Sequence, residues 1–164
     1  MEPLMQVHPF PPLFDENSHI LILGSFPSIK SREQQFFYGH PQNRFWPLMA
    51  LLTGEARPLT IAEKRALILK HGFALWDSIG RCTITGSSDS SIRDVEPNDL
   101  RIITAQAPIE KIFCNGNASL RCYRRYIQPA LGREATLLPS TSPANAAWSL
   151  ERLAEAWRRA IYGG

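Results

Sequence analysis

The sequence predicts an α/β fold in which a parallel sheet carries helices on both faces. Short apolar runs alternate with helical segments along the chain, and polar loops follow the ends of those runs. The chain is 44% hydrophobic, which is enough to form a core. Its 164 residues suffice for one domain and are too few for two ordinary ones. We therefore expect a single domain over residues 1–164.

The first elements are predicted from prolines and from one apolar run. Residues 1–17 hold several prolines and predict an extended Pro-rich N-terminal arm that lies on the surface or packs irregularly. Residues 19–24 are apolar on both faces, which predicts a central strand. The turn at 24–28 ends this strand, and residues 29–43 predict a long functional loop.

The middle of the chain alternates helices with a short strand and a second loop. A helix is expected over about 44–53, and a capping box that begins at Thr60 predicts another that ends near Lys70. Residues 73–76 predict a short strand. Residues 80–97 contain Gly/Ser-rich turns and predict a long loop, followed by a helix over about 98–107.

The last third predicts two more strands, each followed by a helix. The strands are expected at 111–114 and 135–138, and the first of the two helices at about 118–127. The closing helix is predicted by apolar residues at helical spacing, namely Leu150, Leu153, Ala154, Trp157 and Ile161.

Three polar loops are expected to meet at one edge of the sheet. They span 24–43, 115–117 and 139–145, and each follows a predicted strand. Because the carboxyl ends of parallel strands meet at the same edge, the loops should converge where α/β sheets bind ligands. The segment Tyr-Gly-His-Pro-Gln-Asn-Arg-Phe-Trp at 38–46 adds an aromatic ring, an imidazole and an amide to that edge.

Several chemistries are disfavoured by what these loops lack. They contain no Lys/Gly phosphate cradle, no Ser in a G-x-S-x-G elbow and no Cys beside His, which argues against triphosphate binding and acyl transfer. Cys82, Cys114 and Cys122 form no C-x-x-C pair, and the four histidines are scattered. We therefore expect no metal site.

Charge and hydropathy bear on partners and location. The net charge of +3 permits a polyanionic partner without demanding one. No apolar stretch is long enough to span a bilayer, and the N-terminus lacks a basic region followed by an apolar block. We expect a cytoplasmic monomer with no membrane partner.

The loop residues suit recognition of a planar base, although each has a simpler reading. Tyr38 can stack on a ring or be a half-buried surface aromatic. His40 can serve the site or bond only the local backbone, and Asn43 can be no more than a helix cap. Asn115 can be a turn residue. For Asp77, a turn carboxylate is favoured over a base contact.

Four segments together resemble the uracil-DNA glycosylase superfamily, and most closely its hypoxanthine-DNA glycosylase (DNA-deoxyinosine glycosylase) branch. They are Leu-Gly-Ser-Phe-Pro-Ser at 23–28, the segment at 38–46, Phe-Cys-Asn-Gly-Asn-Ala at 113–118, and Leu-Pro-Ser-Thr-Ser-Pro-Ala-Asn at 138–145. The resemblance implies a three-layer α/β/α sandwich with a central four-stranded parallel sheet. It also implies hydrolysis of the N-glycosidic bond of a deaminated base in DNA, with no cofactor.

The resemblance also assigns roles to residues. Mismatch-specific relatives carry a water-positioning Asn where this chain has Phe26, so Asn43 is predicted to orient the water instead. The remaining predicted contacts fall into two groups. Base-binding residues are Gly24, Ser25, Phe26, Tyr38, His40 and Asn115; DNA-binding residues are Ser140, Thr141, Ser142, Pro143 and Asn145.

Three rival functions remain open at this point. The chain can be a non-catalytic nucleic-acid or lesion-binding module that kept the fold and lost its chemistry at Phe26. It can be a uracil or mismatch-specific glycosylase. It can also be a nucleoside hydrolase, although no Asp-rich calcium-binding motif supports that reading.

Overall fold

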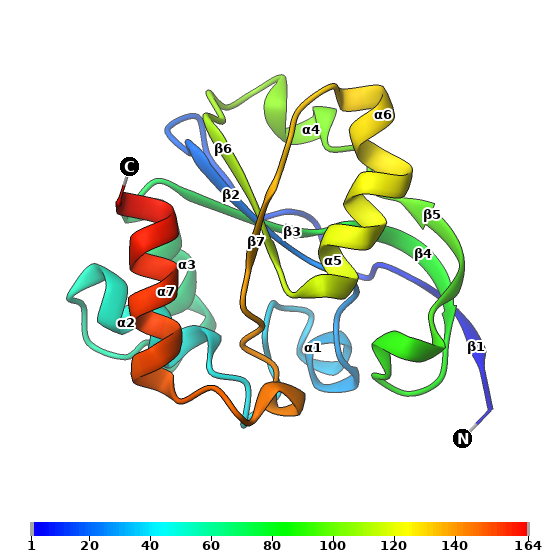
Figure 1. Cartoon of the computed structure of the whole chain (residues 1–164), viewed down its shortest axis with the longest axis horizontal. Helices are drawn as coiled ribbons and strands as arrows, with labels where there is room; N and C mark the ends of the chain where they lie inside the picture. Colours follow the sequence, from blue (N-terminus) through cyan, green and yellow to red (C-terminus); the bar gives the residue numbers. More distant parts are fainter. Residues whose placement is uncertain (1, 164) are drawn as a thin grey trace.

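A four-stranded parallel sheet forms the centre of the computed structural model, which describes residues 2–163 (Figure 1). Its strand order is β3-β2-β6-β7, and all three strand pairs are parallel. The strands are β2 (Ile20–Gly24), β3 (Phe73–Asp77), β6 (Lys111–Asn115) and β7 (Thr136–Leu138). This arrangement confirms the predicted fold class.

The register of this sheet aligns the strand ends that matter for the site. Gly24 pairs with Asp77, Leu23 pairs with Cys114, and Asn115 pairs with Leu138. Every residue of β2 and β3 is buried, as expected for strands covered on both faces. The four carboxyl ends therefore form one continuous edge.

Helices cover both faces of this sheet (Figure 1). On one side lie α2 (Phe45–Thr53), α3 (Ile61–Lys70) and α7 (Leu150–Tyr162). On the other lie α5 (Asn117–Cys122), a π-helical turn (Tyr123–Ile127) and α6 (Gln128–Leu131). No helix within residues 2–163 is both long and apolar enough to cross a bilayer.

Local sequence explains where two of these helices begin. The Thr60 hydroxyl accepts from the Glu63 N–H at 3.1 Å, and the Glu63 carboxylate accepts from the Thr60 N–H at 2.9 Å, so the predicted capping box is present. Ser149 caps α7 through the Arg152 N–H. The apolar stripe of α7, including Leu153 and Trp157, is buried.

A second, antiparallel sheet was not predicted. It has the order β1-β4-β5, with β1 (Leu4–Val7), β4 (Ile79–Ile84) and β5 (Arg93–Pro97). The prediction of a long loop at 80–97 was therefore wrong. Ile79, Cys82 and Ile84 point into a small core, while a Gly/Ser-rich connection that includes a short 3-10 turn (Asp89–Ser91) joins the strands.

The N-terminal arm is more ordered than its prolines suggest. Residues 4–7 pair with β4, and Leu13 forms a bridge to Leu75 on β3 through two N–H···O bonds of 2.9 Å. Phe10 and Leu13 are buried in the main core. The arm thus connects the two sheets instead of lying loosely on the surface, because its apolar residues between the prolines have a core to enter.

Two other predicted segments differ in length. The loop predicted at 29–43 contains α1 (Ile29–Gln34), which Ser28 caps by accepting from the Ser31 N–H. The helix predicted at 98–107 is reduced to α4 (Arg101–Thr104).

Candidate functional site

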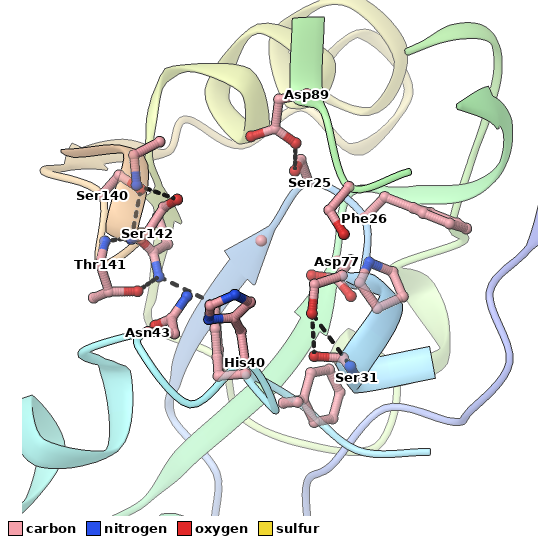
Figure 2. A pocket seen from close by; sticks show the side chains of 18 of the residues that line it. Ser25, Phe26, Ser31, His40, Asn43, Asp77, Asp89, Ser140, Thr141 and Ser142 are labelled. Atoms are coloured by element: carbon pink, nitrogen blue, oxygen red, sulfur yellow. Dashed lines mark hydrogen bonds between the residues drawn. The ribbon is translucent and has the colours of Figure 1, made fainter. Parts of the chain in front are cut away.

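A cavity of about 250 Å³ opens at the carboxyl edge of the parallel sheet. Its wall is formed by the loops that follow β2 and β7, the last residues of β3 and β6, and the connection between β4 and β5. Figure 2 shows Asn43 and residues 140–142 on one side, Phe26 and Asp77 on the other, and Asp89 beside Ser25. All predicted site residues except Asn145 line it: Gly24, Ser25, Phe26, Tyr38, His40, Asn43, Asn115, Ser140, Thr141, Ser142 and Pro143.

Tyr38 is held by contacts on its ring and on its hydroxyl. The residue has a left-handed backbone with φ of 53°, and its ring stacks on Phe45 with centroids 3.9 Å apart. Its Oη accepts a hydrogen bond from Asn115 Nδ2 at 3.3 Å. Burial raises the pKa of Tyr38 far above its usual range, so the phenol stays neutral. Phe45 covers one ring face, and the residue also lines the cavity.

Asn115 links two loops through its side chain. Its Nδ2 donates to Tyr38 Oη and, at 3.0 Å, to Thr141 Oγ1, while its Oδ1 accepts from the Thr141 N–H at 3.1 Å. Thr141 is fully buried. Both amide hydrogens of Asn115 are therefore engaged within the protein, and the residue braces the site more than it offers donors to a ligand.

Asn43 both supports the turn before α2 and lines the cavity. Its Oδ1 accepts from the Phe45 N–H at 2.9 Å, which fixes the orientation of the amide at the start of α2. Its Nδ2 makes no hydrogen bond to any residue in 2–163, and the side chain faces the cavity (Figure 2). The N-cap of α2 is Arg44, so Asn43 supports the turn before the helix and is not its cap, and this local role is compatible with the predicted site role.

Arg44 holds the loop that carries the predicted DNA contacts, and this role was missed from sequence. Its guanidinium donates to the carbonyls of Ser142 and Asn145, each at 3.0 Å, and to that of Trp148. The side chain of Asn145 donates to the Ser140 carbonyl at 3.0 Å. Asn145 therefore stabilises the loop through this hydrogen bond and is not part of the cavity wall.

Phe26 occupies the turn after β2 as a core residue. It is 8% exposed and packs with Ile79, Cys82 and Ile84, while the Arg32 guanidinium lies 5.6 Å from its ring centre. An apolar ring cannot orient a water molecule. Phe26 therefore cannot take the role that a water-positioning Asn would have at this place.

Asp77 and His8 form a buried pair at the inner end of the cavity. His8 Nε2 lies 2.7 Å from Asp77 Oδ2, and the two side chains are only 3% and 7% exposed. A Cβ added at Gly24 would clash with Asp77 Oδ1, so only glycine fits beside this carboxylate. The favoured turn role for Asp77 is too narrow, because the side chain lines the cavity.

His8 gave no signal in the sequence, whereas Asp77 did. Asp77 ends a buried strand, as Gly24 and Asn115 do, and that shared position marks it as a residue of the ligand-binding edge. His8 lies in the arm, 69 positions before Asp77, and only the pairing of β1 with β4 brings them together.

Asp89 is a second carboxylate beside the cavity. Its Oδ1 accepts from the Ser25 hydroxyl at 2.8 Å. Burial raises the pKa of Asp89, the Ser25 hydrogen bond opposes that rise, and the nearby charge of Asp77 adds to it. Within residues 2–163 no group of three metal-ligating side chains is found.

Comparisons with known proteins agree with this geometry. A family model described as the uracil DNA glycosylase superfamily matches residues 11–161. A Methanosarcina acetivorans protein named hypoxanthine DNA glycosylase is 37% identical over 147 residues, 89% of this chain and 92% of that protein. A Methanosarcina barkeri protein of the same name is 35% identical over 159 residues, 96% and 99% of the two chains.

A solved structure extends the likeness to the fold. It is a solution NMR structure of a Methanosarcina acetivorans protein described as a candidate uracil DNA glycosylase, and it superposes with a TM-score of 0.80. The two sequences are 34% identical, and the match covers 96% of each chain. The family match, the two relatives and the shared fold lead to one conclusion: the chain belongs to the uracil DNA glycosylase superfamily.

Proposed function

We propose that this protein is a DNA glycosylase that hydrolyses the N-glycosidic bond between hypoxanthine and deoxyribose in DNA. One observation carries the proposal: Asn43, the Gly24–Ser28 turn and the Ser140–Pro143 loop line a single cavity at the edge of the sheet. Two relatives that match almost the whole chain are named hypoxanthine DNA glycosylase, which supports this choice of base.

The size of the cavity fits a single base. Its volume of about 250 Å³ is below the ~300–1,000 Å³ typical of sites for larger ligands. A base inside the duplex cannot be attacked, so the nucleotide must be turned out of the stack at a cost of a few kcal/mol. Stacking of the base on Tyr38, which lines the cavity, would offset part of that cost.

The reaction needs groups that stabilise charge on both fragments. The C1′–N9 bond breaks, its electron pair goes to the base, and the oxygen of a water molecule bonds to C1′. The proton that the water loses neutralises the departing base. Main-chain amides of the Gly24–Ser28 turn stabilise negative charge on the base, and the Asn43 amide orients the water toward the sugar.

The loop at 140–143 faces the DNA in this proposal. The hydroxyls of Ser140 and Ser142 accept bonds from the N–H groups of Ser142 and Ala144, at 3.1 and 3.2 Å, and each keeps an O–H that can donate to a phosphate oxygen. Pro143 follows Ser142 as a rigid apolar residue at the cavity wall, which suits the gap left by the turned-out nucleotide.

The proposal is tested by single-turnover kinetics on a duplex that contains deoxyinosine. We expect release of free hypoxanthine and an abasic strand, and we expect Asn43→Ala to lower the rate about 10²–10³-fold, as loss of one positioned polar group does in other enzymes. Asn43→Asp keeps the oxygen that accepts from the Phe45 N–H and serves as the control for helix stability.

Two rival functions predict different products. A lesion-binding module would bind the deoxyinosine duplex and release no base, and that result would reject the enzyme. A nucleoside hydrolase would act on free inosine and leave DNA intact. A duplex that contains uracil, assayed alongside, tests whether excision is confined to the purine.

A further inference from the structure

The carboxylate of Asp77 presents an unused acceptor to the inner end of the cavity. The residue is 5% exposed and lines the cavity, and its Oδ2 is occupied by His8 Nε2 at 2.7 Å. Its Oδ1 makes no hydrogen bond to any residue in 2–163. The side-chain atoms of residues 2–163 that are sealed from solvent without a partner are His8 Nδ1, His71 Nε2 and Trp76 Nε1, so Asp77 Oδ1 is open to the cavity and free to accept from a ligand.

The His8 ring is buried among aromatic side chains, and its hydrogen-bond partner there is Asp77. These side chains are Phe10, Phe37 and Trp76, with ring centroids 4.6, 6.5 and 6.3 Å away. Nε2 donates to the carboxylate, while Nδ1 is buried and finds no partner within residues 2–163. Burying a polar ring in this way is costly, and what it achieves here is a fixed orientation of Asp77.

Depth in the cavity separates the base from the sugar. Asp77 ends β3 inside the protein, whereas Asn43, Ser142 and Pro143 are only half-buried. A nucleotide that swings out of a duplex stays attached to its backbone at the rim, and its base goes in first. Asp77 therefore faces the base edge far from the sugar, where Asn115 has no amide hydrogen to spare.

An ionised carboxylate only accepts hydrogen bonds. Hypoxanthine carries a hydrogen on N1, so that edge donates, whereas N1 of adenine carries a lone pair and would meet the carboxylate with repulsion. A buried group built to pair with one hydrogen on a substrate rejects an analogue that lacks it, by up to ~10⁴–10⁵-fold.

We propose that Asp77 recognises the N1–H of a 6-oxopurine and so excludes adenine, with His8 as its positioning residue. This inference rests on the proposed glycosylase function and deepens it by naming the group that selects the base. The oxygen of Asp77 is set between Gly24, which must lack a side chain, and His8, which holds the other oxygen.

The test compares two bases of the same ring size in one duplex context: hypoxanthine, and unsubstituted purine, which has a lone pair at N1 and no hydrogen there. For wild type we expect an excision-rate ratio above about 10³ in favour of hypoxanthine. Asp77→Asn can still pair with His8 and can turn a donor toward N1. We expect it to reduce the ratio at least 30-fold.

Both excision rates are measured on the same preparation of each variant. An unfolded fraction lowers the two rates equally, so their ratio is unaffected. Asp89→Asn removes one negative charge beside the same cavity, and we expect it to leave the ratio within threefold of wild type. If Asp77→Asn keeps the wild-type ratio, or if Asp89→Asn changes it as much, the inference is wrong. If wild type releases no hypoxanthine, the proposed function itself fails.

A second pair of variants tests His8. His8→Gln keeps an N–H donor, and we expect a ratio close to wild type. His8→Leu leaves the carboxylate without its partner, and we expect the ratio to fall toward that of Asp77→Asn. A purely structural His8 would lower the melting temperature in His8→Leu and leave the ratio unchanged, which would overturn its positioning role.

Discussion

Gly24 shows how one missing side chain shapes the site. It faces Asp77 across parallel strands, and an added Cβ would clash with Asp77 Oδ1 and lie 3.4 Å from Tyr38 Oη. The close approach of β2 to this carboxylate therefore depends on glycine. A small change at this position moves the acceptor that we assign to the base.

Gly24→Ala is expected to impair activity more than stability. Because the carboxylate must shift by a sizeable fraction of an ångström or more, we expect kcat/KM on deoxyinosine duplex to fall about 10²-fold. Kinetics and thermal unfolding measured on the same sample check this. Gly54→Ala is the contrast: its φ of 72° predicts a loss of about 1 kcal/mol in stability, with nothing within 4 Å to disturb.

At the scale of elements, Arg44 joins the start of α2 to the loop before α7. Three main-chain carbonyls accept from its guanidinium, and the Arg44 N–H donates to the Thr141 carbonyl at 3.1 Å. A planar fork can satisfy several carbonyls at once, which an ammonium group cannot match. The loop at 140–145 is therefore held in place from α2.

Arg44→Lys tests this link. We expect faster amide hydrogen exchange in residues 142–148. We also expect KM for duplex DNA to rise about tenfold, because the loop that contacts DNA is held less firmly, while kcat changes less. The exposed Arg158, which reaches only the Leu51 carbonyl at 3.5 Å, supplies the control Arg158→Lys. Equal exchange in the two variants would contradict the proposed restraint.

Elements with strong local signals could be predicted from the sequence, and those built by distant pairing could not. The capping box of α3 and the apolar stripe of α7 are local, and both helices were found as expected. β1 and β4 pair across some 77 positions, so neither showed its partner in the sequence. The same reason hid His8, whereas Asp77 was visible but given a narrower role.

The site was predicted best where the segments themselves are distinctive. The motifs at 23–28, 38–46 and 138–145 together supply most of the cavity wall. What they could not supply was the use of each side chain. Asn115 is occupied by Tyr38 and Thr141, and Asn145 supports the loop from behind. The hydrogen-bond partner of each amide depends on which donors and acceptors the fold brings near it, and the spacing of residues in the sequence does not show this.

At the scale of the whole molecule, both buried thiols lie in cores that disfavour charge. Cys82 and Cys114 are fully buried, and burial raises the pKa of each to about 11. In the unfolded chain a thiol ionises near 9, so above that pH the unfolded state loses its protons first. Folding is therefore opposed as pH rises.

We expect the free energy of unfolding to fall between pH 9 and pH 11. Each thiol contributes a slope of up to about 1.4 kcal/mol per pH unit in that window. Denaturant titrations at several pH values measure it. Cys114→Ala should be less stable at pH 7, because a core atom is lost, yet show a shallower pH dependence; an unchanged slope would refute the assignment.

The connection between the two sheets has a consequence for how the chain assembles during synthesis. β1 leaves the ribosome before the other strands of this domain, but its partner β4 ends at residue 84. Until then β1 has no strand to pair with, and His8, which follows it, is not held beside Asp77. The pocket is thus completed late, and under the proposal for Asp77 a cleavage between His8 and β2 would remove the imidazole that orients the base-selecting carboxylate.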